Sequence, residues 1–197
     1  MSLLRRLLVR NMLLDRQLEV LAAGGIRPNP GVELSDLLAR HRESEYERSP
    51  FRLLLSVLGS NSETEPYQPL SDDIWFLNVE RIAAPGDYVC LVNRMATLAR
   101  GALPIVDVHD QIDLRQSAAR LWFTLHGRGI TWQAKIEEGW IDARVMTNFA
   151  DLLEAQDTDR RFTYLDLHGT ECLIGCATPQ ELATLRHETG LDFEWLG

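Results

Sequence analysis

Lysine is almost missing from this chain, and cysteine is scarce. Of the 20 basic residues only Lys135 is a lysine, so a reaction that depends on a lysine has a single candidate. The three cysteines are Cys90, Cys172 and Cys176. A small, odd number of cysteines argues against a disulfide scaffold and indicates a reducing compartment. We therefore expect a cytoplasmic protein.

Long apolar runs and familiar catalytic motifs are missing as well. Arginines interrupt the leucine-rich start, MSLLRRLLVRN, so it does not have the pattern of a secretory leader. No stretch approaches the roughly 18 apolar residues that indicate a membrane span. The chain also lacks a phosphate-binding GxxxxGK[ST] loop and the GxSxG, HExxH and CxxC motifs. We expect neither membrane insertion nor a cofactor.

Basic residues are fewer than acidic ones, and the deficit lies after residue 60. The 20 basic and 29 acidic residues give a net charge of −9. The first 60 residues are slightly basic, and the remainder carries the whole acidic excess. An acidic body repels phosphate backbones, so we expect no direct nucleic-acid binding and favour a basic protein partner. The alternative is that the charge serves solubility alone.

The 197 residues suggest a helical segment followed by a mixed domain. Hydrophobic residues make up 45%, the usual globular proportion. Helices are expected at 2–22, at 32–46, and from Ser49 and Pro50 to Gly59. The pattern-free stretch 60–71 is the best linker. This predicts a helical segment at 1–59 and an α+β domain at 72–197, unless both form one continuous domain. The first helix is apolar on two sides, which suits burial between layers or a homodimer contact.

The order of elements after the linker predicts an α+β fold. Two glycine-started turns, Gly127-Arg128 and Gly169-Thr170, predict two hairpins. They imply a largely antiparallel sheet of two hairpins plus extra strands, with helices packed on one face. Strands are expected at 74–81, 104–108, 119–126, 129–137, 162–168, 171–176 and 191–196. Helices are expected from 87 to 101, from 142 to 155, and from the capping box at Thr178 to about 187.

The expected registers sort each hairpin into an apolar and a polar face. In the first hairpin the apolar face carries Leu121, Phe123, Leu125, Ile130, Trp132, Ala134 and Ile136. Its polar face carries Arg120, Trp122, Thr124, His126, Thr131, Gln133, Lys135 and Glu137. In the second hairpin the apolar face carries Thr163, Leu165, Leu167, Cys172, Ile174 and Cys176. Its polar face carries Tyr164, Asp166, His168, Glu171 and Leu173.

Aromatic side chains among charged ones are typical of protein-binding anchors. The polar faces and the acidic junction after the first hairpin therefore predict a partner-binding surface. The alternative is a sheet face covered by a helix or by the N-terminal segment. Asp142 in this junction is expected to act as a helix N-cap. The predicted binding residues are Trp122, His126, Glu137, Glu138, Trp140, Tyr164, His168 and Glu171.

A second hypothesis is a metal-dependent hydrolase. Asp107, His109, Asp110 and Asp113 follow a short strand, and His with carboxylates suits a divalent metal or acid–base chemistry. The alternative is an acidic loop in which Asp stabilises turns. A zinc site from His168, Cys172 and Cys176 is not expected, because the register places the histidine and the cysteines on opposite faces.

Three segments resemble bacterial immunity proteins that neutralise a toxin made by the same cell. They are Gly139-Trp140-Ile141-Asp142 before a helix, and Arg161-Phe162-Thr163-Tyr164 and Glu171-Cys172-Leu173-Ile174-Gly175 in a late hairpin. The resemblance spans at most residues 74–197. It implies a non-catalytic inhibitor that binds and blocks a basic toxin.

Overall fold

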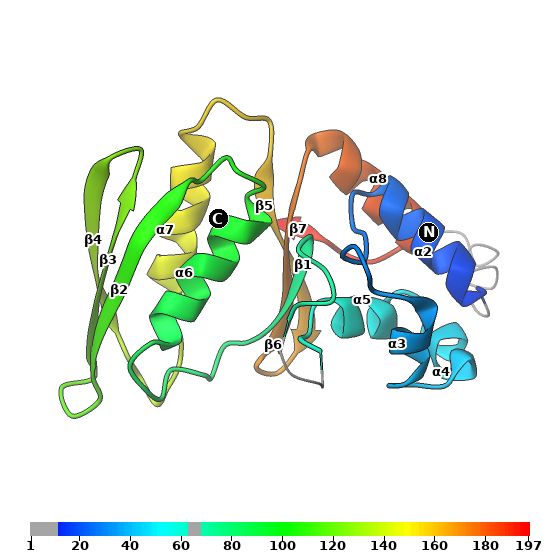
Figure 1. Cartoon of the computed structure of the whole chain (residues 1–197), viewed down its shortest axis with the longest axis horizontal. Coiled ribbons are helices and arrows are strands. Elements are labelled where there is room, and N and C mark those ends of the chain that lie inside the picture. The colour runs from blue at the N-terminus through cyan, green and yellow to red at the C-terminus, as the bar shows by residue number, and fades with distance from the viewer. Residues whose placement is uncertain (1–11, 63–67) are drawn as a thin grey trace.

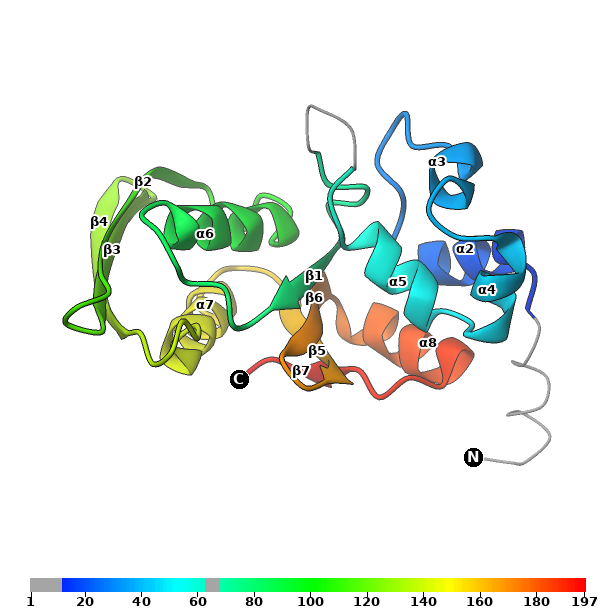
Figure 2. The same cartoon turned by 90° about the horizontal axis from the view of Figure 1, so that it is seen from below.

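The computed structural model describes residues 12–62 and 68–197, and it has four layers (Figures 1 and 2). An outer three-stranded sheet is followed by a pair of helices, a four-stranded central sheet and an N-terminal helical layer. All strand pairs are antiparallel. The α+β class is therefore confirmed. The two hairpins fall into separate sheets, with strand orders β2-β3-β4 and β1-β6-β5-β7.

The N-terminal layer consists of short helices. They are α2 (Leu14–Ala23), α3 (Leu34–Leu38), α4 (Glu43–Arg48) and α5 (Arg52–Leu58). The expected helix at 32–46 is split, because the Glu45 side chain accepts the backbone N–H of Arg42 and begins a new helix there. The expected start at Ser49 and Pro50 is wrong, because Phe51 has a φ of 65°. The first part of the predicted helix 2–22 lies outside the described residues.

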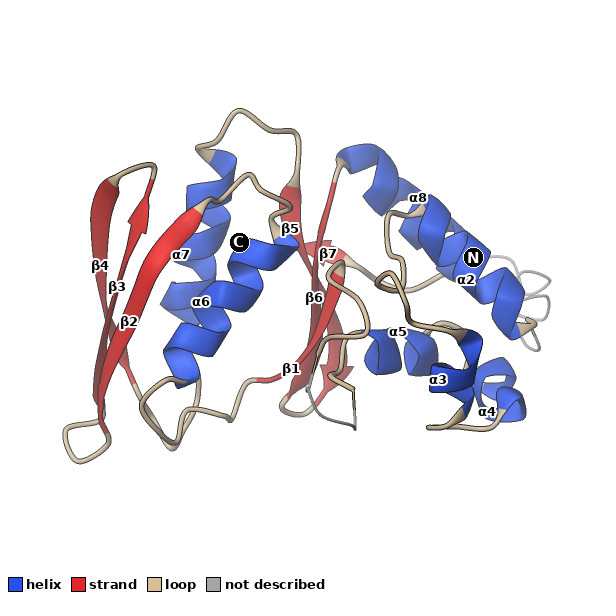
Figure 3. Cartoon of the chain, in the orientation of Figure 1, coloured by secondary structure: helices blue, strands red, loops and turns tan. Residues whose placement is uncertain are grey.

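The remaining elements follow the predicted order (Figure 3). Asp142 and Thr178 are confirmed as N-caps, each accepting a backbone N–H of its helix. The strand expected at 104–108 continues to Asp113, and the last strand is only two residues long. The bounds are β1 (Ile74–Asn78), α6 (Asp87–Leu98), β2 (Ile105–Asp113), β3 (Ala118–Leu125), β4 (Arg128–Lys135), α7 (Ala143–Glu154), β5 (Arg161–His168), β6 (Glu171–Ala177), α8 (Pro179–Thr189) and β7 (Glu194–Trp195).

The central sheet is buried on both faces. One core, which we call the inner core, lies between the two sheets around α6 and α7 and includes Cys172, Ile174 and Cys176 of β6. The second core lies between the central sheet, α8 and the N-terminal helices, and it includes Leu173 and Ala177 of the same strand. Successive side chains of a strand point to opposite faces, so β6 contributes to both cores. A strand buried in this way cannot present a polar face.

The first hairpin has the predicted faces but a different turn. His126 and Gly127 form it with φ angles of 50° and 74°, which is the pattern of a type I′ turn rather than the expected Gly127-Arg128 turn. Leu121 lies opposite Trp132, and Phe123 lies opposite Ile130. This register differs from the predicted one by two positions. Because side chains alternate with a period of two, the apolar and polar faces are as predicted.

The predicted faces of the second hairpin are wrong. Tyr164 lies opposite Ile174, one position away from the expected pairing, and a bulge between Asp166 and His168 absorbs the extra residue. A shift of one position moves Tyr164 to the same side as Cys172 and Cys176. The expected polar face therefore does not exist, because both sides of this hairpin are covered by helices (Figure 2).

Arg100 ties three layers together just beyond the end of α6. Its guanidinium donates to the backbone carbonyl of Gly25 and pairs with Asp73 at 2.7 Å. It also lies 3.9 Å from Glu181 of α8, whose carboxylate binds Arg160 at 2.9 Å. These partly buried ion pairs fix the N-terminal layer relative to the central sheet.

Candidate functional site

The junction between β4 and α7 presents an aromatic side chain on a fixed backbone. Trp140 is 39% exposed. It forms an isolated β-bridge with Glu80, and the next amide, that of Ile141, donates to the Val79 carbonyl at 2.8 Å. The Ile82 amide donates to the Gly139 carbonyl at 2.8 Å. The junction is therefore held in place before any partner arrives.

Four glutamates lie on the segments that pair at or next to this junction, and we name them, together with Trp140, the acidic edge. They are Glu80, Glu137, Glu138 and Glu171, all exposed. Residues 78–82 connect them, pairing with the β5–β6 turn on one side and with residues 139–141 on the other. Within residues 12–62 and 68–197, none of the four carboxylates has a hydrogen-bond or ion-pair partner.

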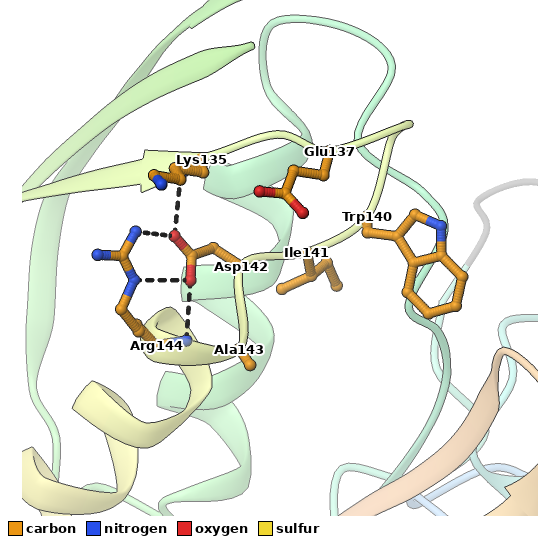
Figure 4. A pocket seen from close by; sticks show the side chains of 7 residues that line it. All are labelled: Lys135, Glu137, Trp140, Ile141, Asp142, Ala143 and Arg144. Carbon is orange, nitrogen blue, oxygen red and sulfur yellow. Dashed lines mark hydrogen bonds and ion pairs between the residues drawn. The ribbon is translucent and has the colours of Figure 1, made fainter.

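A hollow of about 280 Å³ lies beside Trp140 (Figure 4). The Glu137 side chain lies between those of Trp140 and Asp142 in this view, and no dashed line reaches its carboxylate. Glu137 also lines a second, shallower hollow with Ser117, Glu138 and Trp140. Trp140 and the carboxylates of Glu137 and Glu138, which have no partner among the described residues, are available to a cationic group.

Asp142 has a structural role at this site. Its carboxylate accepts the backbone N–H groups of Lys135 and Arg144 at 2.9 and 3.0 Å, and the Arg144 guanidinium at 2.6 Å. These bonds, chiefly those from the Arg144 side chain, lower the pKa of Asp142 to about 2 against the opposing effect of burial. The carboxylate joins the end of β4 to the start of α7 and has no free oxygen for a ligand.

The structure places Trp122 and His126 on the outer sheet, away from the acidic edge. Trp122 lies on the outer face of β3, with His109 stacked 5.5 Å away and Arg120 5.7 Å from its ring. His126 lies in the β3–β4 turn, its Nε2 3.0 Å from the Gln156 side chain.

Tyr164 is half buried against the inner core, where burial raises its pKa. His168 is exposed in the β5–β6 turn next to Glu171, and its ring lies 3.6 Å from Asp166. Only Glu137, Glu138, Trp140 and Glu171, with His168 beside them, therefore share one region. Glu80 was not anticipated, because a single long-range bridge brings it to Trp140 and leaves no local pattern.

The four residues of the predicted metal site lie within β2 rather than in a loop. Asp110 points inward and accepts the backbone N–H groups of Gly86, Tyr88 and Val89 at the start of α6. His109 stacks on Trp122 at the outer face instead. Within the described part of the chain, no three His, Cys, Asp or Glu residues are arranged to share a metal ion.

The other two residues of the predicted metal site, Asp107 and Asp113, have structural roles in β2 and in the turn that follows it. Asp107 occupies the bulge of β2 with a φ of 54°. Asp113 accepts the backbone N–H groups of Arg115 and Gln116 in the turn that follows. Alternation along a strand sends the neighbouring side chains of His109 and Asp110 to opposite faces, so these two cannot share a metal ion.

Cys172 and Cys176 are buried in the inner core. Burial raises the pKa of Cys172 to about 12 and that of Cys176 to about 11. His168 is exposed at the turn. The expectation that these three do not form a zinc site agrees with their placement, although the register on which it was based is wrong.

Comparison with known proteins adds no relative. No family model, curated protein or solved structure matches this chain. Among the described residues, no helix combines the length and the apolar character needed to cross a bilayer.

Proposed function

We propose that this chain is a non-catalytic binding module of the immunity type, which binds and blocks a basic partner protein through the acidic edge. One observation carries the proposal. Trp140 is exposed on a backbone that two hydrogen bonds to residues 79 and 82 hold in place, and the four carboxylates of the acidic edge have no partner among the described residues. The resemblance of residues 139–142 to toxin-neutralising proteins supports the same partner class.

The physical chemistry of the edge favours a cationic ligand. Like charges raise the energy of a surface, and an arginine or lysine of a partner would relieve this repulsion. The face of a tryptophan ring attracts a guanidinium or ammonium group within about 6 Å. Tryptophan is also among the residues that most often dominate binding energy. The net charge of −9 would steer a basic partner and speed its association.

The hydrolase hypothesis has less support. Asp110 and Asp113 already accept backbone N–H groups, and His109 lies against Trp122. These contacts explain the positions of the three side chains without a metal ion. We therefore place the function at the acidic edge.

Purification of the native protein from its source at low salt tests the proposal. We expect a basic polypeptide to co-purify with the wild type and to be lost from the Trp140→Ala variant and from the Glu137→Gln/Glu138→Gln variant. The control variant Asp15→Asn/Glu43→Gln removes the same charge at two exposed positions of the N-terminal helices, and it should retain the polypeptide. Equal capture by all four proteins would refute the assignment.

A further inference from the structure

The strand β4 has a free edge. Among the described strands it pairs with β3 alone, and the two-residue turn makes Leu125 and Arg128 the first hydrogen-bonded pair. The alternate residues Gly129, Thr131 and Gln133 therefore direct their N–H and C=O groups away from β3. Lys135 continues this series, and its outward N–H is bound by Asp142. In the described part of the chain, the outward groups of the other three have no partner.

The other sheet edges are blunted. β2 is interrupted by a bulge between Val106 and His109 and carries several aspartates. The edge of β1 is partly occupied, because the Phe76 amide donates to the Gly59 carbonyl of the helical layer. The strand β7 has only two residues. Bulges, charges and short strands are the usual protection of an edge. Among the described strands, β4 is the long, regular edge that lacks such protection.

The side chains of this edge are also incompletely covered. Ile130 and Trp132 point toward the inner core but stay half buried. The Trp132 ring is fixed edge-on against Phe123 and Phe149, at 5.1 and 5.0 Å. Residues 129–133 carry no charge. An added strand would cover apolar surface that β4 leaves open.

We propose that a second copy of this chain pairs with β4, with antiparallel strands related by a two-fold axis at Thr131. In this register Thr131 lies opposite its own copy, and Gly129 lies opposite Gln133. The outward backbone groups of these residues have no partner in the described part of the chain, so the Thr131 pair and the two Gly129–Gln133 pairs can all form hydrogen bonds. Ile130 then lies opposite Trp132 of the second copy, as a non-hydrogen-bonded apolar pair. The two three-stranded sheets become one continuous sheet.

The charges at the ends of β4 are compatible with this pairing. Arg128 and Lys135 project from opposite faces of the sheet, because their positions differ by an odd number. No two like charges are therefore opposed in the proposed register. The seam is formed by β4 alone and does not depend on the acidic edge, so either proposal can fail without the other.

Light scattering over a concentration series tests the pairing. We expect the mass to rise from 22.4 kDa toward twice that value as the concentration increases. Thr131→Pro removes an outward N–H without removing a bond to β3, and edge strands accept proline at such positions. It should weaken dimerisation at least about tenfold, since both bonds of the central pair are lost. Thr131→Val retains the N–H and should dimerise like the wild type.

A second variant and a second readout guard against a folding defect in the proline variant. Thr131→Lys places two cations opposite each other at the axis, so dimerisation should weaken and recover as salt is added. Hydrogen exchange of the Gly129, Thr131 and Gln133 amides should slow with concentration. A wild type that stays monomeric throughout, or a dimer whose three amides exchange at the monomer rate, overturns the proposal.

Discussion

Asp142 is the residue on which the geometry of the junction depends most. Its carboxylate fixes the end of β4 and the start of α7. Asp142→Ala should lower the free energy of unfolding by about 1 kcal/mol, the usual cost of a lost N-cap. Asp142→Asn keeps a cap acceptor and should lose less. Chemical denaturation of the three proteins measures both differences.

The pH dependence of this effect follows from the lowered pKa. Asp142 titrates near 2 in the fold, below its ordinary value of 3.8. Its charge therefore stabilises the protein fully above about pH 4, and this contribution is lost as the pH falls toward 2. The stability gap between wild type and Asp142→Asn should close over that window. A gap that stays constant down to pH 2 would show that the carboxylate charge has no such role.

The three thiols should differ in reactivity. Cys90 is exposed, whereas Cys172 and Cys176 are buried with raised pKa values. A thiol reagent at pH 8 should therefore modify one cysteine rapidly in the folded protein and all three after denaturation, because the thiolate is the reacting form. Cys90→Ser should abolish the rapid phase. Rapid modification of two or more thiols in the folded protein would contradict the described core.

At the scale of elements, the two hairpins show what the sequence can and cannot specify. Alternation from Leu121 to Leu125 identified the buried face of the first hairpin, although the turn lies one residue earlier than expected and the register differs by two positions. The second hairpin is apolar on both faces, so alternation carried no information about its register. A one-residue bulge near His168 then decided which side Tyr164 faces. Such a bulge has no periodic signature.

The contact between α5 and β1 depends on a glycine. A Cβ at Gly59 would lie 2.5 Å from the backbone nitrogen of Phe76, which cannot move without disturbing the central sheet. Gly59→Ala should therefore destabilise the fold by about 1–3 kcal/mol. Gly129 has open space around its Cβ position and serves as the control. Equal melting temperatures for the Gly59→Ala and Gly129→Ala variants would contradict this packing.

At the scale of the whole molecule, the N-terminal layer completes the second core. Leu54, Leu55 and Leu58 of α5 share a hydrophobic cluster with Leu165 and Leu173 of the central sheet. The sequence predicted both groups of elements but not their layering, because the division of strands between two sheets rests on long-range pairing. The acidic edge shows the same limit, since Glu80 joins it only through the tertiary fold.

The shared core predicts the behaviour of a fragment. Residues 72–197 alone would expose the face that carries Leu165 and Leu173, so the fragment should bind a hydrophobic dye and lose a sharp unfolding transition. The full chain should unfold in one cooperative step. A monomeric fragment with a sharp transition would show that the α+β part is an independent domain.

Titration calorimetry with the co-purifying polypeptide tests the central claim most directly. We predict that Glu137→Gln/Glu138→Gln weakens binding at least about tenfold at low salt, since charge-assisted contacts at an interface commonly contribute more than 1.4 kcal/mol. The Asp15→Asn/Glu43→Gln control should bind like the wild type. Equal affinities for the wild type and the Glu137→Gln/Glu138→Gln variant would contradict the assignment of function to the acidic edge.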